Sequence, residues 1–176
     1  MLLTAKVPSR SFLVDSVTAG ILLALALAIQ NLRLPNLITG AVVNAVFVVA
    51  VSVGGVRSAL LLAGLTPVGA FLTGHLPPPM ILLLPVIIPG NIIYVVMCDL
   101  LRTRSLTSEA VAASAAKAVL IGAGGFLLSR LMNWPAGTVA LLWGIAGIQF
   151  FTAIAGVVLG EIVAGRIGRS NGTGRV

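Results

Sequence analysis

Six apolar stretches follow one another along this chain, and each is long enough to cross a lipid bilayer as a helix. A membrane-spanning helix needs about 20 predominantly apolar residues. Short breaks rich in glycine, proline and polar residues separate the stretches, as in "QNLRLPN" and "MNWPAG". The sequence therefore predicts an all-α integral membrane protein, a bundle of six transmembrane helices at residues 12–30, 37–55, 57–74, 79–100, 108–131 and 136–166.

The composition indicates that lipid covers the surface of this protein. Hydrophobic residues make up 59% of the 176 residues and charged residues only 9%, with a mean hydropathy of +1.15. A soluble domain carries about 25% charged residues, so this chain has too few polar groups to cover a surface in water. In such a chain the net charge of +7 reports membrane topology and does not indicate binding of nucleic acid.

The positive charges fall unevenly between the two sides that six spans would define. Only Arg33 and Arg130 lie on one side. Because cytoplasmic segments carry the excess of Lys and Arg, we predict that both termini are cytoplasmic. Residues 1–10 would form the N-terminal segment, 11–167 the transmembrane domain and 168–176 a disordered tail. The other side carries eight basic residues: Lys6, Arg10, Arg57, Arg102, Arg104, Arg166, Arg169 and Arg175.

Four polar residues fall inside four different apolar stretches, namely Asn44, Asn91, Lys117 and Gln149. A rise of 1.5 Å per residue places each in the middle third of its span or slightly outward. Polar groups at this depth are costly and often functional, so we predict that they converge on a central cavity. The alternative is that each only holds two helices together, with a hydrogen bond worth about 1 kcal/mol.

Lys117 is the one basic residue inside a predicted span. One interpretation is that it binds an anion in the cavity or forms an ion pair, with Asp99 and Glu109 near the inner boundary as possible partners. The other is that its long side chain reaches back to the inner membrane surface.

Five of the nine prolines lie between residues 77 and 89. Pro77–Pro79 fall where one span ends and the next begins, and a first helical turn tolerates proline. Pro85 and Pro89 are expected well inside the fourth span, where each leaves a carbonyl without its donor one turn earlier. Pro67 repeats this device in the third span. Such breaks shape binding cavities in transporters, although a kink that serves packing alone is the alternative.

Small residues recur every fourth position on the first span, at Gly20, Ala24 and Ala28. Such a stripe lets another helix approach closely. Either the stripe packs inside the bundle, or it docks another membrane protein. The last two spans carry similar stripes: Ser114, Ala118 and Gly122, then Gly156, Gly160 and Ala164.

Several kinds of active site are not expected. The chain has no GxxxxGK[ST] loop, so it does not hydrolyse ATP itself. Its only histidine, His75, lies in a predicted outer loop, which argues against an imidazole metal site. The four acidic residues all lie away from the span centres, which argues against a carboxylate proton relay. We expect no catalytic residues, no metal and no cofactor. We also expect the chain to be one subunit of a larger complex.

Two segments carry a more specific resemblance. "LPNLITGAVVNAVFVVAVSVGG" contains TG-x-x-VNA, and "GLTPVGAFLTGHLPPPMILLLPVIIPGN" contains a TP followed by P-x-x-x-x-GN. With six spans, this length and cytoplasmic ends, residues 11–167 resemble the substrate-binding (S) component of energy-coupling factor transporters.

This resemblance implies a subunit in the cell membrane of a prokaryote that captures a vitamin, cofactor precursor or similar small molecule from outside. It implies a membrane coupling subunit and two cytoplasmic ATPase subunits as partners, which would use the ATP. Ala24 and Ala28 match the family's Ala-x-x-x-Ala docking motif, with Gly20 one turn earlier. The absence of an N-terminal histidine argues against nickel and cobalt. The candidate substrate-binding residues are Asn44, Asn91, Lys117, Gln149 and Thr39, with Tyr94 and Trp143 as possible stacking rings.

Two other classes of protein remain open. The chain is compatible with a membrane scaffold or assembly factor, in which the polar groups only join helices. It is also compatible with a small homo-oligomeric channel.

Overall fold

The computed structural model describes residues 10–76 and 78–170, and the regular secondary structure of these residues consists of helices joined by short connections. Five helices are long and apolar enough to cross a membrane: α1, α2, α4, α5 and α6. Large apolar side chains such as Ile21, Val119 and Phe151 point outward and are about two thirds exposed. The protein is therefore a multi-pass helical membrane bundle. Its helices are α1 (Arg10–Asn31), α2 (Asn36–Leu72), α3 (Pro78–Leu82), α4 (Leu84–Leu101), α5 (Leu106–Leu131) and α6 (Ala136–Ser170).

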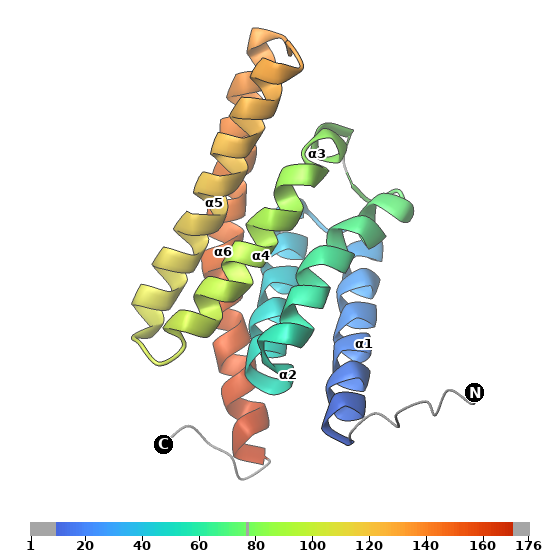
Figure 1. Cartoon of the computed structure of the whole chain (residues 1–176), viewed down its shortest axis with the longest axis vertical. Helices are drawn as coiled ribbons and strands as arrows, with labels where there is room; N and C mark the ends of the chain where they lie inside the picture. Colours follow the sequence, from blue (N-terminus) through green and yellow to red (C-terminus); the bar gives the residue numbers. More distant parts are fainter. Residues whose placement is uncertain (1–9, 77, 171–176) are drawn as a thin grey trace, which may run out of the picture.

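Helix α2 contains two of the predicted spans and folds back on itself at Gly55 (Figure 1). Gly55 has φ 75° and ψ 168°, a conformation that is essentially restricted to glycine. We call residues 36–54 the first limb of α2 and residues 56–72 the second limb. Because of this reversal, both limbs line one cavity, described below.

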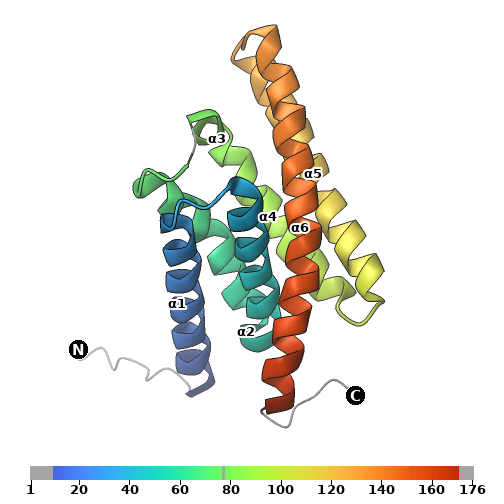
Figure 2. The same cartoon turned by 180° about the vertical axis from the view of Figure 1, so that it is seen from behind.

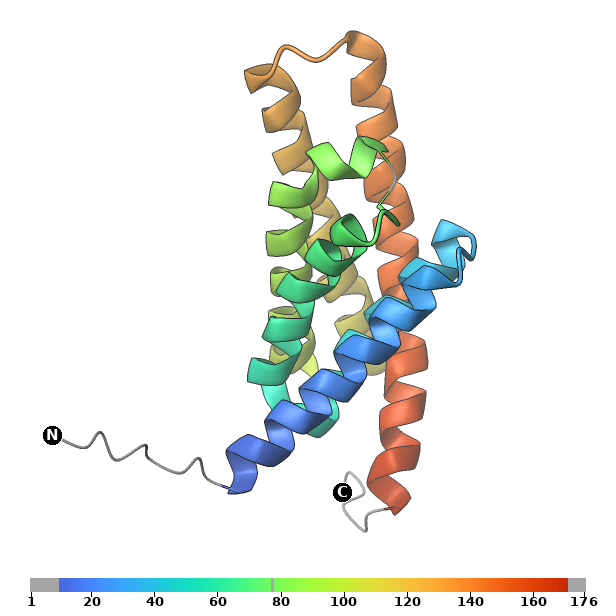
Figure 3. The ribbon, with the colours of Figure 1, turned by 90° about the vertical axis from the view of Figure 1, so that its right-hand side faces the viewer.

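The helices form a ring in which α2 contacts α4 and α6, and α5 contacts the same two helices. Helix α1 packs mainly on α2 and crosses the outside of the bundle diagonally (Figure 3). Glycines on α6 permit its close approach to the first limb. A Cβ on Gly156 would overlap Asn44, and one on Gly160 would lie 2.6 Å from Cβ of Val48. The stripe of small residues on α6 therefore serves packing within the bundle.

The bundle has two distinct ends (Figures 1 and 2). At the terminal end, α1 begins, α2 turns at Gly55, α4 joins α5 and α6 ends. At the loop end lie the α1–α2, α2–α3 and α5–α6 connections, with Arg33 and Arg130. Lys6 and Arg175 lie outside the described residues. Apart from Lys117, the other basic positions of the described chain belong to segments at the terminal end: Arg10 starts α1, Arg57 follows Gly55, Arg102 and Arg104 lie between α4 and α5, and Arg166 and Arg169 lie near the end of α6.

The fourth predicted span, 79–100, is divided in the structure. Helix α3 ends at Leu82, and α4 begins at Leu84 with Pro85 in its first turn. The prediction that Pro85 lies well inside the fourth span is therefore wrong. The chain turns at Leu83, whose carbonyl accepts from the N–H groups of Val86 and Ile87, both at 2.8 Å. A proline in this first turn removes an N–H that has no partner within its helix. Pro89, in contrast, does lie inside α4.

The helix ends also differ slightly from the predicted bounds. Helix α1 begins at Arg10, and α6 continues to Ser170, so residues 168–170 of the predicted tail are helical. Residues 1–9 and 171–176, and Pro77, lie outside the described residues. Helix bounds are hard to predict here because Arg166 to Ser170 form a polar segment that contains no proline to stop the helix.

Candidate functional site

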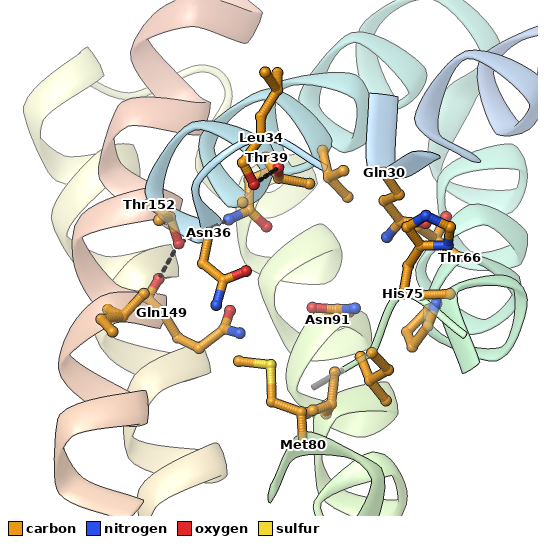
Figure 4. A pocket seen from close by; sticks show the side chains of 18 of the residues that line it. Gln30, Leu34, Asn36, Thr39, Thr66, His75, Met80, Asn91, Gln149 and Thr152 are labelled. Carbon is orange, nitrogen blue, oxygen red and sulfur yellow. Dashed lines mark hydrogen bonds between the residues drawn. The ribbon is translucent and has the colours of Figure 1, made fainter. Parts of the chain in front are cut away.

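A cavity of about 360 Å³ lies at the loop end of the ring (Figure 4). This volume falls within the range of roughly 300–1,000 Å³ that is usual for small-molecule sites. The α1–α2 and α2–α3 connections contribute Leu34 and His75 near its mouth. Both limbs of α2, together with α4, α5 and α6, form its walls, so only the folded ring creates it.

Half of the cavity lining is polar, and among the described residues it includes no Asp or Glu. Lys117, Arg33 and His75 are the side chains in it that can carry positive charge. Phe47 is the only phenyl ring among the lining residues that are described. The eleven polar residues in the lining are Gln30, Arg33, Asn36, Thr39, Asn44, Thr66, His75, Asn91, Lys117, Gln149 and Thr152.

The four polar residues that the sequence placed at membrane depth all line this cavity. Asn44 comes from the first limb of α2, Asn91 from α4, Lys117 from α5 and Gln149 from α6. The amides of Asn91 and Gln149 point toward the cavity in Figure 4. Thr39 also lines it, five residues before Asn44 on the first limb, and its hydroxyl donates to the carbonyl of Leu34 at 3.2 Å.

Lys117 is held in the interior and does not reach back to a membrane surface. Only 2% of the residue is exposed. Its Nζ donates to Oδ1 of Asn44 at 2.7 Å and lies 5.2 Å from the ring centroid of Tyr94. Asn44 in turn donates through Nδ2 to Thr152 Oγ1 at 3.4 Å. These contacts join α2, α4, α5 and α6. Asp99 was predicted as a possible partner of Lys117, but its Oδ1 instead lies 3.9 Å from Nη1 of Arg102.

The amide of Asn91 replaces a hydrogen bond that a proline removes. Pro67 has no N–H, so the carbonyl of Ala63, four residues earlier, lacks its helical donor. Asn91 Nδ2 donates to that carbonyl at 3.4 Å across the α2–α4 contact. The neighbouring Gly90 brings α4 close to α5, because a Cβ there would lie 2.6 Å from Ile121 Cγ1.

Three polar atoms in the cavity wall are buried without a hydrogen-bond partner: Gln30 Oε1, Thr66 Oγ1 and His75 Nδ1. Buried polar atoms are normally paired with protein or ordered water, and the structure shows no hydrogen-bond partner for these three. Thr66 is the clearest case, because only 1% of the residue is exposed. Ser114 Oγ is also buried and unpartnered, but Ser114 does not line the cavity.

Five further residues line the cavity that were not predicted as site residues: Gln30, Asn36, Thr66, His75 and Thr152. Thr66 belongs to the TP motif, but only the proline of that motif, Pro67, was expected to shape a cavity. Gln30 and Asn36 lie at helix ends and His75 lies in a connection, and their positions depend on the folded ring. Thr152 lies inside α6, where the sequence does not show which side of the helix faces a cavity.

The two predicted stacking rings do not line the cavity. Tyr94 is fully buried in the core, and its hydroxyl donates to the carbonyl of Ala153 at 3.0 Å. Trp143 lies on the outer surface of α6 and is 59% exposed. It is six residues from Gln149, which rotates it about 120° around the helix, away from the cavity. Neither of these two rings is therefore placed to stack on a flat ligand in the cavity.

The small-residue stripe of α1 faces away from the rest of the bundle. Gly20, Ala24 and Ala28 are exposed, and a Cβ on Gly20 would meet no atom within 4 Å. The opposite face of α1 is the one that packs, with Ala19 and Ala26 buried. This stripe therefore does not serve packing within the chain.

Within residues 10–76 and 78–170, no three His, Cys, Asp or Glu side chains gather as a metal site would require. No family model, no curated protein and no solved structure matches the chain.

Proposed function

We propose that this chain is the substrate-binding subunit of an ATP-driven importer of the energy-coupling factor type. It would capture a vitamin, cofactor precursor or similar small molecule. The observation that carries the proposal is the cavity, whose wall contains three buried polar atoms without partners. Such atoms cost free energy in an empty site, and a bound ligand would satisfy them.

In this proposal the two limbs of α2 cross the membrane separately, which makes six spans with both termini in the cytoplasm of a prokaryote. The distribution of Arg and Lys supports this orientation, because basic residues concentrate at the terminal end. The cavity at the loop end would then face the outside, from which a substrate arrives.

Uptake against a gradient needs a source of energy, and this chain contains no phosphate-binding loop. A membrane coupling subunit with two cytoplasmic ATPase subunits would supply it. The exposed stripe Gly20, Ala24 and Ala28 offers such a subunit a surface on which helices can approach to backbone contact.

Native mass spectrometry of the detergent-purified protein tests the proposal. The protein is first incubated with the small-molecule fraction of a bacterial lysate. We expect wild-type protein to retain a small molecule and Thr66→Val to lose it. Thr66→Val removes an unpaired hydroxyl at nearly constant volume, so the thermal stability should hardly fall.

Ser114→Ala is the matched control, because it removes a buried unpaired hydroxyl outside the cavity. This variant should retain the molecule. If no molecule binds to wild-type protein, the binding function is refuted and a scaffold becomes the better explanation. If both variants bind the molecule equally well, the cavity is not the binding site. Ion current through the protein alone in a planar bilayer would instead indicate a channel.

A further inference from the structure

We propose that the ligand of this cavity is a compact anion, with a carboxylate or phosphate group that binds Lys117. This inference rests on the proposed binding function and assigns the chemical class of the substrate. It draws on the charge of the cavity wall, on the contacts of Lys117 and on the distribution of the remaining polar atoms.

The charge of the wall is the first argument. The lining includes Lys117 in its deep part and Arg33 at its mouth, whereas the lining residues that are described include no carboxylate. A cationic ligand would meet an unscreened ammonium group in a low-dielectric site, which is strongly unfavourable. An anion would meet a charge of opposite sign at both ends of its path.

The contacts of Lys117 are the second argument. Its ammonium has three N–H donors, and the structure gives it one amide acceptor, Asn44 Oδ1, and the face of the Tyr94 ring. Neither partner carries a charge. Burial of an ammonium is costly unless an opposite charge compensates it, and a ligand anion would provide that compensation inside the cavity.

Asn44 fixes where the anion would bind. Its side chain is held between Thr152 Oγ1 and Lys117 Nζ, so the ammonium is oriented before a ligand arrives. Asn91, on α4, also presents its amide to the cavity (Figure 4). An oriented ammonium beside neutral amides suits one anionic group and leaves the net charge of the complex low.

The rest of the ligand would be polar and not a flat ring system. Toward the mouth, Gln30, Thr66 and His75 gather on one side of the cavity, and each holds an unpartnered buried atom (Figure 4). Phe47 is the one carbocyclic ring in the described lining. Hydroxyl, amide or amine groups on the ligand would pair with these three atoms while its anionic group binds Lys117.

Asn44→Asp is the decisive variant. It is nearly isosteric and places a carboxylate 2.7 Å from Lys117 Nζ, where Oδ1 now lies. The internal carboxylate would neutralise the ammonium and exclude a ligand anion. Since a hydrogen bond to a charged group contributes about 1.5–3 kcal/mol, we expect affinity to fall about ten- to a hundredfold. Asn133→Asp makes the same chemical change at an exposed loop position and should leave affinity unchanged.

The probe is the small-molecule fraction of a bacterial lysate, and the bound molecule is released by denaturation and tested for retention on an anion-exchange resin at neutral pH. Release of an anion from wild-type protein and from Asn133→Asp, with at least a tenfold loss in Asn44→Asp, supports the inference. If Asn44→Asp does not purify as a folded protein, Lys117→Met should show the same loss.

Two other outcomes overturn the inference and are distinguishable. A neutral or cationic molecule that binds wild-type protein and Asn44→Asp equally well would leave the binding function standing but refute the anionic class. Absence of any bound molecule from wild-type protein would refute the binding function itself.

Discussion

Asn91 donates its Nδ2 to the carbonyl of Ala63 at 3.4 Å, the carbonyl that Pro67 leaves without a helical partner. The TP motif of α2 and the GN motif of α4 are therefore one structural unit, although they lie in different helices. The contact places α4 against the second limb of α2, beside the cavity that both helices line.

This relationship predicts that Asn91 and Pro67 are energetically coupled. Asn91→Leu should lower the free energy of unfolding by about 1–2 kcal/mol, because it leaves the Ala63 carbonyl unpaired in an apolar interior. In a Pro67→Ala background, the backbone N–H of residue 67 can bind that carbonyl, so the same change should cost less. Unfolding of the four proteins in detergent gives the coupling energy. Equal costs of Asn91→Leu in both backgrounds would contradict the contact.

The second prediction concerns the close approach of α6 to α2. A Cβ on Gly156 would overlap Asn44, so Gly156→Ala should destabilise the protein by about 1–3 kcal/mol through overpacking. It should also weaken ligand binding, because Asn44 holds Lys117. Gly144→Ala, on the same helix with no atom within 4 Å of the added carbon, is the matched control and should change neither property. Thermal unfolding and binding of both variants provide the measurement.

The third prediction assigns the exposed stripe of α1 to a partner. Ala24→Trp and Ala28→Trp should leave folding and ligand binding intact, because both positions face away from the bundle. They should abolish uptake in cells, because a large ring prevents a partner helix from approaching.

Ala26→Trp provides the contrast on the same helix, since Ala26 is fully buried. This variant should fail to fold and should lose ligand binding as well. If Ala24→Trp and Ala28→Trp proteins bind ligand and still support normal uptake, α1 is not the docking surface.

The fourth prediction is the membrane orientation. A cysteine at Asn133, at the loop end, should react in intact cells with a maleimide that does not cross membranes. A cysteine at Thr103, at the terminal end, should react only after the cells are opened. The native Cys98 is buried and should not react. The reverse pattern would place the cavity on the cytoplasmic side and would remove the support for an importer.

The sequence by itself determined the class of this protein and the depth of its polar residues. Long apolar stretches leave a chain no alternative to membrane helices, because backbone groups in lipid must pair within their own segment. The constant rise per residue along a helix predicts that Asn44, Asn91, Lys117 and Gln149 lie at a similar depth. Gly55, where α2 reverses, ends the predicted span 37–55, directly before the span predicted at 57–74.

Only the tertiary structure decided which way each helix faces. Hydrophobicity is nearly uniform around a helix that is surrounded by lipid and by apolar helices, so the sequence does not distinguish an outward from an inward face. For this reason Trp143 was expected at the cavity but lies on the surface, whereas the orientation of the Gly20 stripe stayed undecided. The pairing of Asn91 with Ala63 and of Lys117 with Asn44 joins residues far apart in the chain, and such contacts exist only once the ring has closed.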